Sequence, residues 1–149
     1  MGKIIYHPIG IIRTPFKPGD KVPVQPKFAE GTEGEIEIFP EYVQGLKDIE
    51  KFSHIILIYH FHLCHGYKLL VKPFFDDKIR GVFSTISPHR PNPIGISIVR
   101  LKEVKNNIIK VSDVDIIDKT PLLDIKPYVP VFDRRKNVKI GWLENKLRF

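Results

Sequence analysis

The sequence lacks several features that mark common classes of protein. Its single cysteine, Cys64, excludes an internal disulfide. No apolar run approaches the ~18 residues that a membrane-spanning helix needs. The N-terminal residues MGKIIYHPIG lack the long apolar stretch and cleavage site of a signal peptide. We therefore expect a cytoplasmic protein that does not span a membrane.

Glycine-rich phosphate-binding motifs and recognisable metal motifs are also missing. No glycine-rich turn joins a strand to a helix, which argues against a doubly wound nucleotide-binding fold. His60 and His62 share one face of a predicted strand, as a zinc-binding pair does, but no second pair of ligands follows. We expect no metal site. Cys64 is interpreted as a small buried hydrophobe, with a reactive thiol beside His65 as the alternative.

Positive charge is abundant. The chain of 149 residues has a formal net charge of +7, which favours an anionic partner such as nucleic acid. The basic residues are spread along the sequence, so a solvated lysine-rich surface remains an alternative interpretation. The length suits one ordinary domain with its own core.

Short β-branched runs and proline-rich connections dominate the chain. We expect strands within residues 4–12, 32–39, 54–62, 81–86, 95–104 and 108–118, and a turn at Asn106 and Asn107. Pro40 should open a short helix, and residues 120–130 read as a loop with a short strand inside. The most apolar run, residues 54–62, should lie in the middle of a sheet. The pattern predicts an all-β fold, either a barrel or a sandwich.

The segment FSTISPHRPNPIG is a stiff loop that presents polar side chains. Its three prolines fix the backbone around Arg90 and Asn92. Arg90 can clamp a phosphate or a carboxylate, and Asn92 can bind an adenine-like edge. A purely structural turn is the alternative.

A second polar segment, DIIDKTPLLDIKPY, covers residues 115–128. Its carboxylates, Asp115, Asp118 and Asp124, suit ribose hydroxyls, and Tyr128 offers a stacking surface. A metal site is the alternative, since aspartates alone can hold Mg²⁺, but their spacing here matches no EF-hand loop. We therefore favour ligand binding over metal binding. Plain turn chemistry remains open.

Taken together, these motifs resemble a known family. IGIIRTPF, VPVQP, GLKDIEKFSHIILIYHFH, GVFSTISPHRPNPIG and DVDIIDKTPLLDIKPYVP occur in the order and spacing of the TsaA-like, or TrmO, family. The resemblance covers roughly residues 4–133, and the blocks RPNPIG and TPLLDIKPY are its most specific parts. It implies a domain of residues 1–133, with a basic C-terminal extension, residues 134–149, packed on it.

The resemblance also implies a fold and an activity. The family fold is a small β-barrel with one or two short helices, and its members form homodimers. The implied activity is S-adenosyl-L-methionine-dependent methylation of N6 of N6-threonylcarbamoyladenosine, at position 37 beside the anticodon of tRNA. Two alternatives stay open: an RNA-binding barrel without catalysis, and a methyltransferase acting on another adenine-like or amide substrate.

Family residues carried over onto this sequence give a candidate cofactor site. It consists of Val24, Gln25, Pro26, His62, Leu63, Ile96, Asp118, Lys119, Thr120 and Pro121. The resemblance implies that relatives of the bacterial type commonly have arginine where this chain has Ile86 and glutamine where it has Leu63, and often glycine where it has Lys119. With isoleucine at position 86, this chain lacks a charged contact to the cofactor that the resemblance implies, which bears on cofactor affinity and on substrate identity.

The resemblance and the residue chemistry together suggest roles. Asp118 or His62 would accept the proton that the methylated nitrogen loses, with Asp118 preferred. Arg90 would bind the threonyl carboxylate or a tRNA phosphate, Asn92 a base edge, and Tyr128 would stack on a base. Dispersed lysines and arginines would hold the anticodon arm.

Overall fold

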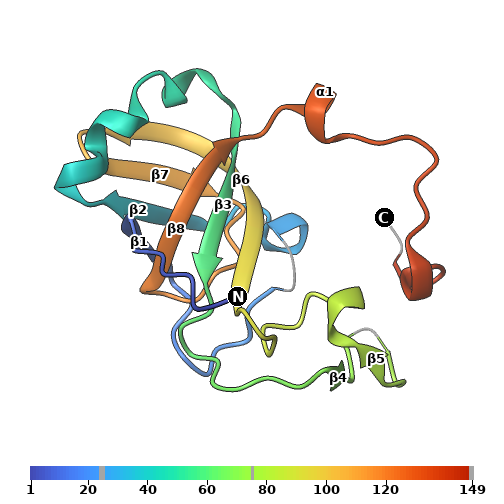
Figure 1. Ribbon diagram of the computed structural model, residues 1–149. Coiled ribbons are helices and arrows are strands. Elements are labelled where there is room, and N and C mark those ends of the chain that lie inside the picture. The colour runs from blue at the N-terminus through green and yellow to red at the C-terminus, as the bar shows by residue number, and fades with distance from the viewer. Residues whose placement is uncertain (24–25, 75, 148–149) are drawn as a thin grey trace. The chain divides into compact units, whose positions relative to one another are not determined.

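Six strands close into a barrel in the order β1-β2-β7-β6-β3-β8, and every neighbouring pair is antiparallel (Figure 1). The computed structural model describes residues 1–23, 26–74 and 76–147. The barrel strands are β1 (Gly10–Arg13), β2 (Glu33–Ile38), β3 (His54–His60), β6 (Ile94–Lys105), β7 (Ile108–Ser112) and β8 (Thr120–Pro127). The predicted all-β barrel with few short helices is confirmed.

The chain divides into two compact units. The barrel unit comprises residues 1–63 and 94–128, and the small unit comprises residues 64–93 and 129–149. The barrel unit also contains the 3₁₀ helices η1 (Pro26–Ala29), η2 (Pro40–Leu46) and η3 (Ile49–Lys51). The small unit contains β4 (Leu70–Val71), β5 (Arg80–Gly81), η4 (Val82–Ser84), α1 (Pro130–Asp133) and η5 (Gly141–Leu143). The predicted packing of residues 134–149 on a domain of residues 1–133 stays a prediction.

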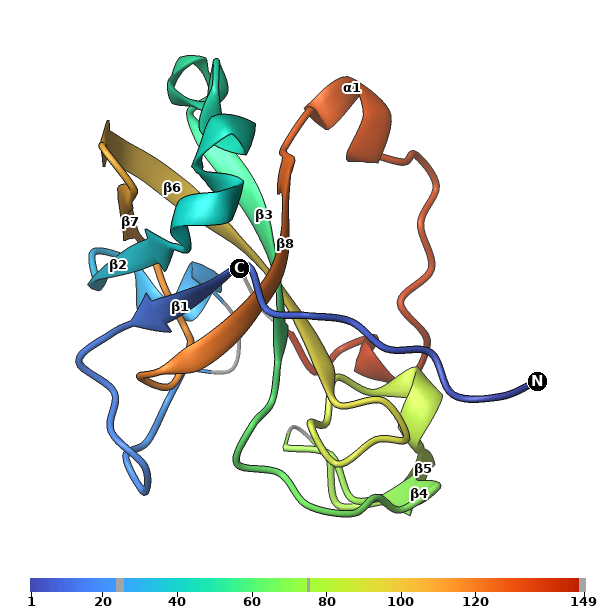
Figure 2. The same ribbon diagram turned by 60° about the vertical axis from the view of Figure 1, so that its left-hand side comes forward.

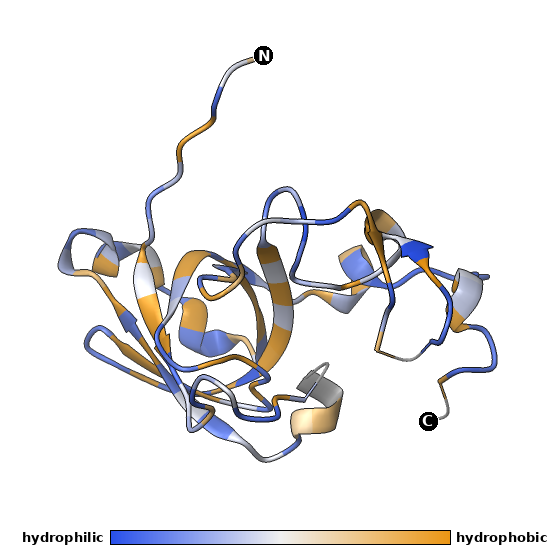
Figure 3. Ribbon diagram, turned by 90° about the horizontal axis from the view of Figure 1, so that it is seen from below, coloured by the Kyte–Doolittle hydropathy of each residue, from blue (hydrophilic) through white to orange (hydrophobic). Residues whose placement is uncertain are grey.

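Alternation of side chains along the strands builds the barrel core. On β3, Ile55, Leu57 and Tyr59 are buried, while the residues between them face outward. The strand lies between β6 and β8, as its apolar sequence predicted. Figure 3 shows apolar and polar residues alternating along the barrel strands.

Gly95 allows two aromatic rings to pack inside the barrel at the start of β6. A Cβ atom built there would lie 2.7 Å from Cζ of Phe61 and would also overlap the ring of Tyr59. The two rings meet edge to face with centroids 5.4 Å apart. Any side chain at this position would therefore displace one of the rings.

The short helix predicted at Pro40 is confirmed as η2, and η3 follows it. Leu46 is buried in the core, and Val43 and Ile49 pack against it. Pro40 suits the first helical position because its missing N–H has no partner to lose there. The predicted turn after β6 is also confirmed, with Asn106 at a φ of 57°.

Several expectations about strands were wrong in extent. The strand expected over residues 108–118 ends at Ser112, as β7. The strand expected from residue 4 begins only at Gly10, after Pro8 has interrupted the ladder. The strand expected over residues 81–86 gives way to η4, where Ser84 Oγ donates to the Gly81 carbonyl at 2.8 Å. Such hydroxyls offer the backbone an alternative to strand pairing.

A further difference concerns residues 120–130. Instead of a loop with a short strand, residues 120–127 form β8, which pairs with both β1 and β3. Pro121 and Pro127 lie at or next to the ends of this strand, where a missing N–H costs least.

Candidate functional site

Most of the described candidate cofactor residues gather where β3 ends. His62 and Leu63 follow that strand directly, and Ile96 on β6 is paired with Ile58 of β3. β8 borders β3 on its other side and begins with Thr120 and Pro121, close to the same end (Figure 2). Residues from three adjacent strands thus converge, all within the barrel unit.

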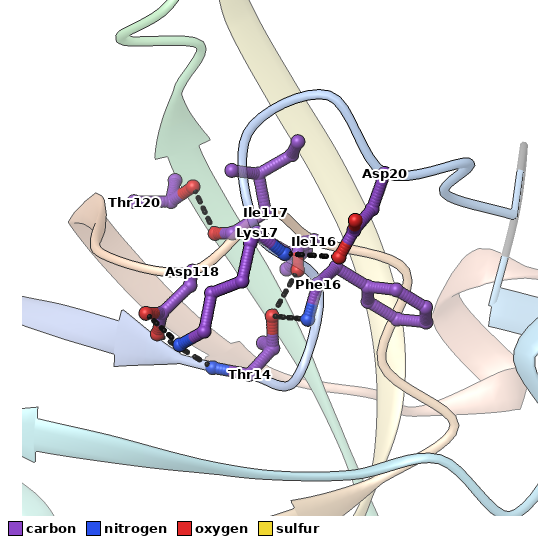
Figure 4. Close-up of polar contacts among 8 residues, drawn as sticks. All are labelled: Thr14, Phe16, Lys17, Asp20, Ile116, Ile117, Asp118 and Thr120. Atoms are coloured by element: carbon purple, nitrogen blue, oxygen red, sulfur yellow. Dashed lines mark hydrogen bonds and ion pairs between the residues drawn. The ribbon is translucent and has the colours of Figure 1, made fainter.

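Asp118 joins this end of β8 to the segment after β1 (Figure 4). Its Oδ1 accepts the backbone N–H of Thr14 at 3.0 Å, and its Oδ2 accepts Lys17 Nζ at 2.8 Å. Its own N–H donates to the carbonyl of Phe16 at 2.7 Å. The carboxylate therefore fixes the start of the loop that leads to η1.

These bonds also set the charge state of Asp118. The hydrogen bond from Lys17 lowers the pKa of this carboxyl, outweighing the burial that would raise it, and the Thr14 N–H lowers it further. Asp118 is therefore ionised at neutral pH. Both of its oxygens already accept a hydrogen bond, so the side chain holds the segment after β1 against the start of β8.

The turn before β8 is ordered by two threonines. Thr14 Oγ1 donates to the carbonyl of Ile116, and Thr120 Oγ1 donates to that of Ile117, each at 2.6 Å. Lys119, immediately before Thr120, adopts a φ of 67°, in the left-handed region. Glycine is the residue best suited to that conformation, so a lysine here holds a backbone geometry that glycine would adopt at lower cost.

His62 differs from Asp118 in that it keeps a free acceptor. Burial lowers the pKa of the half-buried His62 imidazole, and His60 nearby lowers it further. The ring is therefore neutral at neutral pH. Within the described part of the chain it forms no hydrogen bond. It can accept a proton without first breaking a contact.

Two of the candidate cofactor residues, one after β3 and one on β6, have exposed apolar side chains. Leu63 is 46% and Ile96 is 62% exposed. Neighbouring Ile94, also on β6, is 42% exposed. Exposed apolar surface near the end of β3 suits a ligand with an aromatic ring.

The other candidate residues lie elsewhere. Val24 and Gln25 fall outside the described residues, and Pro26 begins η1. Tyr128 follows β8, where its N–H donates to the His54 carbonyl and its ring lies 6.2 Å from that of His54. It is thus beside the first residue of β3, whereas His62 follows the last.

Arg90 and Asn92 belong to the small unit, as does Ile86. Arg90 Nη1 donates to the carbonyls of Thr85 and Ser87, each at 3.0 Å. The arginine therefore stiffens its own loop, and its remaining N–H groups point to no described partner. Asn92 is exposed.

Sequence reasoning missed two features of the barrel unit. One is the pairing of Lys17 and Thr14 with Asp118, which lies more than a hundred residues further along the chain. The other is an interior chain of hydrogen bonds from Tyr59 through Ser97 to Asp115, with distances of 2.8 and 2.6 Å. Burial raises the pKa of the Asp115 carboxyl to about 6.

No group of three or more metal-binding side chains occurs among the described residues. No helix in the part of the chain that the structure describes is long and apolar enough to cross a membrane. Cys64 is half-buried, and burial raises the pKa of its thiol, which disfavours the reactive thiolate.

A surface pocket of about 520 Å³ opens beside η2, η3 and the later half of β8. Its walls include Leu46, Phe52, Asp124 and Pro127. Because β8 begins near Asp118, this pocket lies towards the other end of that strand. None of the predicted cofactor residues lines it.

The fold and these residues together define a class: a small antiparallel β-barrel with a candidate ligand site at one end, distinct from doubly wound nucleotide-binding proteins. A family model described as the N-terminal domain of tRNA-methyltransferase O matches residues 11–134. The chain belongs to this family, and the predicted resemblance is confirmed.

Named relatives are similar along most of the chain. A "Probable S-adenosyl-L-methionine-binding protein" of Pyrococcus abyssi is 60% identical, over 97% of this chain and 78% of its own length. The tRNA (adenine(37)-N6)-methyltransferase of Escherichia coli is 39% identical, over 87% of this chain. A crystal structure of TrmO from Pseudomonas aeruginosa superposes with a TM-score of 0.79 and 36% identity, over 94% of this chain. This chain spans only 60% of the Escherichia coli enzyme and 62% of the Pseudomonas aeruginosa chain.

Proposed function

We propose that this protein is an S-adenosyl-L-methionine-dependent tRNA methyltransferase that methylates N6 of N6-threonylcarbamoyladenosine at position 37. The observation that carries the proposal is the convergence of His62, Leu63, Ile96 and residues 118–121 at the end of β3, in a chain of this family. The proposed tRNA substrate implies that the protein acts in the cytoplasm.

The residues at the end of β3 fit S-adenosyl-L-methionine. Exposed Leu63 and Ile96 offer apolar surface to an adenine ring. The ordered turn at Lys119 presents backbone groups to the polar parts of the cofactor. The ionised Asp118 carboxylate supplies negative charge, which favours a sulfonium cation. When bound, the cofactor supplies an electrophilic methyl group, so the protein's main task is alignment.

His62 is the better candidate for accepting the proton from the methylated nitrogen. Its imidazole is neutral and has no hydrogen-bond partner among the described residues. Asp118 was preferred from the sequence, but its two oxygens are already bonded to Thr14 and Lys17. Asp118 is therefore proposed as a positioning residue that holds the loop after β1 against the start of β8.

Substrate contacts are proposed for three further residues. Arg90 would bind either the threonyl carboxylate or a tRNA phosphate through its unused N–H groups, since Nη1 is occupied by its own loop. Asn92 would bind a base edge, and Tyr128 would stack on a base.

A homodimer is proposed from the outer surface of the barrel. Ile56 and Ile58 of β3 face outward and are paired with Ile98 and Ile96 of β6, and Ile94 continues the row. Such a contiguous apolar surface is unusual on a monomer. A second copy of the chain that covers Ile56, Ile58 and Ile98 would border the proposed cofactor site, to which Ile96 belongs. Sedimentation should give a dimer, and Ile98→Glu should give a monomer.

The test of the activity uses purified protein, S-adenosyl-L-methionine and tRNA that contains N6-threonylcarbamoyladenosine. Digestion and mass spectrometry should find the modified nucleoside heavier by one methyl group. The same tRNA prepared without the threonylcarbamoyl group is the matched control and should stay unmethylated. Binding of tRNA without methyl transfer would indicate a non-catalytic RNA-binding barrel. Transfer to another base would assign a different substrate.

A further inference from the structure

The two units carry very different net charges. The segments that form the small unit, residues 64–93 and 129–149, contain eleven lysines and arginines and four acids, giving +7. The segments of the barrel unit contain thirteen of each, giving zero. The small unit therefore accounts for the whole net charge of the protein, which is +7.

Most of this positive charge is also unneutralised locally. Among the described basic residues of the small unit, only Arg80 and Lys146 form an ion pair, and both pair with Asp76. Lys72, Lys136 and Lys139 are exposed and contact no carboxylate among the described residues. In the barrel unit, by contrast, six basic residues have an acidic partner: Arg13, Lys17, Lys51, Arg100, Lys110 and Lys126.

Aromatic side chains are exposed on the same unit. Tyr67 is 57%, Phe83 is 76% and Phe132 is 69% exposed. Exposed rings among unpaired lysines and arginines characterise proteins that bind single-stranded nucleic acid, because bases stack on the rings while the cations contact phosphates.

The small unit presents these groups from an ordered framework. The Asp76 side chain is fully buried and accepts Arg80 Nε at 2.7 Å. Burial alone would raise the pKa of Asp76, but the hydrogen bonds from Arg80 and from the backbone of Asp77 and Lys78 outweigh it and lower that pKa. The anchor therefore stays ionised.

Trp142 fastens the C-terminal segment to the same framework. Its Nε1 donates to the Ser84 carbonyl at 2.7 Å, and the Arg80 guanidinium lies 5.5 Å from the centroid of its ring. Two segments distant in sequence are thus joined into one basic unit, and less ordering is needed on binding.

We infer that the small unit is the surface on which single-stranded RNA docks, with its unpaired lysines contacting phosphates and its exposed rings stacking on bases. That the RNA is the anticodon loop of a tRNA rests on the proposed function. The docking itself requires no methyl transfer.

The test compares two variants with the same change of charge. The first, Lys72→Gln/Lys136→Gln/Lys139→Gln, alters the small unit. The control, Lys47→Gln/Lys102→Gln/Lys105→Gln, removes three exposed lysines of the barrel unit that form no ion pair with a described residue. Binding of a fluorescently labelled tRNA anticodon stem-loop is measured by anisotropy at several salt concentrations, and S-adenosyl-L-methionine binding by calorimetry.

The small-unit variant should bind the RNA about tenfold more weakly or worse near 0.1 M salt, and its salt slope should fall by about 2, since each phosphate contact contributes about 0.7 to 0.9. The control should bind the RNA like the wild type, and both variants should keep cofactor affinity. Equal losses in the two variants, or no loss in the first, would overturn the inference.

Further measurements distinguish RNA docking on the small unit from membrane binding and from the proposed methyl transfer. Phe83→Ala and Phe132→Ala should each weaken RNA binding about fivefold or more if bases stack on these rings. The first variant is also compared with the wild type for binding to phosphatidylserine vesicles. If that variant loses vesicle binding but keeps its RNA affinity, the surface binds anionic membranes and the inference is overturned. If the wild-type protein binds the RNA through the small unit but transfers no methyl group, the proposed function fails and the docking surface stands.

Discussion

The buried Asp115 carboxyl should make the stability of the protein depend on pH in a calculable way. Burial raises its pKa from 3.8 to about 6, although Ser97 Oγ donates to it at 2.6 Å. Asp115 is only 9% exposed, so solvent screens the cost little. The folded state holds a proton that the unfolded state releases, and stability therefore decreases as the pH rises from about 4 to about 6.

The magnitude follows from the size of the shift. A difference of about two pKa units corresponds to roughly 3 kcal/mol of unfolding free energy, since each unit is worth about 1.4 kcal/mol. Asp115→Asn removes the charge and keeps an oxygen that Ser97 can bond. The variant should therefore gain up to roughly 3 kcal/mol relative to the wild type between pH 4 and pH 7.5.

The assay is urea unfolding of both proteins at pH 4, 5, 6 and 7.5, followed by circular dichroism. The exposed Glu50→Gln variant serves as the control for removing a carboxylate and should track the wild type across this range. A stability difference between Asp115→Asn and the wild type that stays constant with pH would refute the reasoning, because the buried charge would then cost nothing.

Other substitutions test the remaining contacts. His62→Ala should lower kcat by roughly 10²- to 10⁴-fold, and the wild-type rate should already be on its plateau at pH 7, because the lowered pKa of His62 leaves the ring unprotonated there; steady-state kinetics across pH checks both. Lys17→Gln should destabilise the fold by only about 0.5–1 kcal/mol in urea unfolding, because that lysine is largely exposed, yet should raise the pKa of Asp118, which nuclear magnetic resonance titration measures. Lys119→Gly should be more stable than Lys119→Val by about 1–2 kcal/mol, since the φ of 67° is left-handed. Gly95→Ala should cost about 1–3 kcal/mol through overlap with the aromatic rings inside the barrel.

Local sequence patterns predicted the barrel where strands obey simple rules. The run around Leu57 is apolar on both faces, and that pattern correctly placed β3 between two other strands. Prediction failed where side chains compete with the ladder, as Ser84 does after β5. It also failed at β8, where Pro121 and Pro127 suggested a loop although both lie close to the strand ends.

The candidate site was only partly predictable. His62 and Asp118 came from motifs, but the hydrogen bond that Lys17 donates to Asp118 depends on the closure of the barrel, which no local pattern encodes. The location of the net charge was also hidden. Lysines and arginines look dispersed along the chain because the segments 64–93 and 129–149 come together only in the folded structure.

The most direct test of the account is calorimetric titration of S-adenosyl-L-methionine into three proteins: the wild type, Ile96→Asp, and Ile5→Asp as a control at another exposed isoleucine of the barrel unit. Cofactor binding at the end of β3 requires one site per chain in the wild type and the control, and a severe loss of affinity in Ile96→Asp. Equal binding by all three proteins would show that the cofactor lies elsewhere.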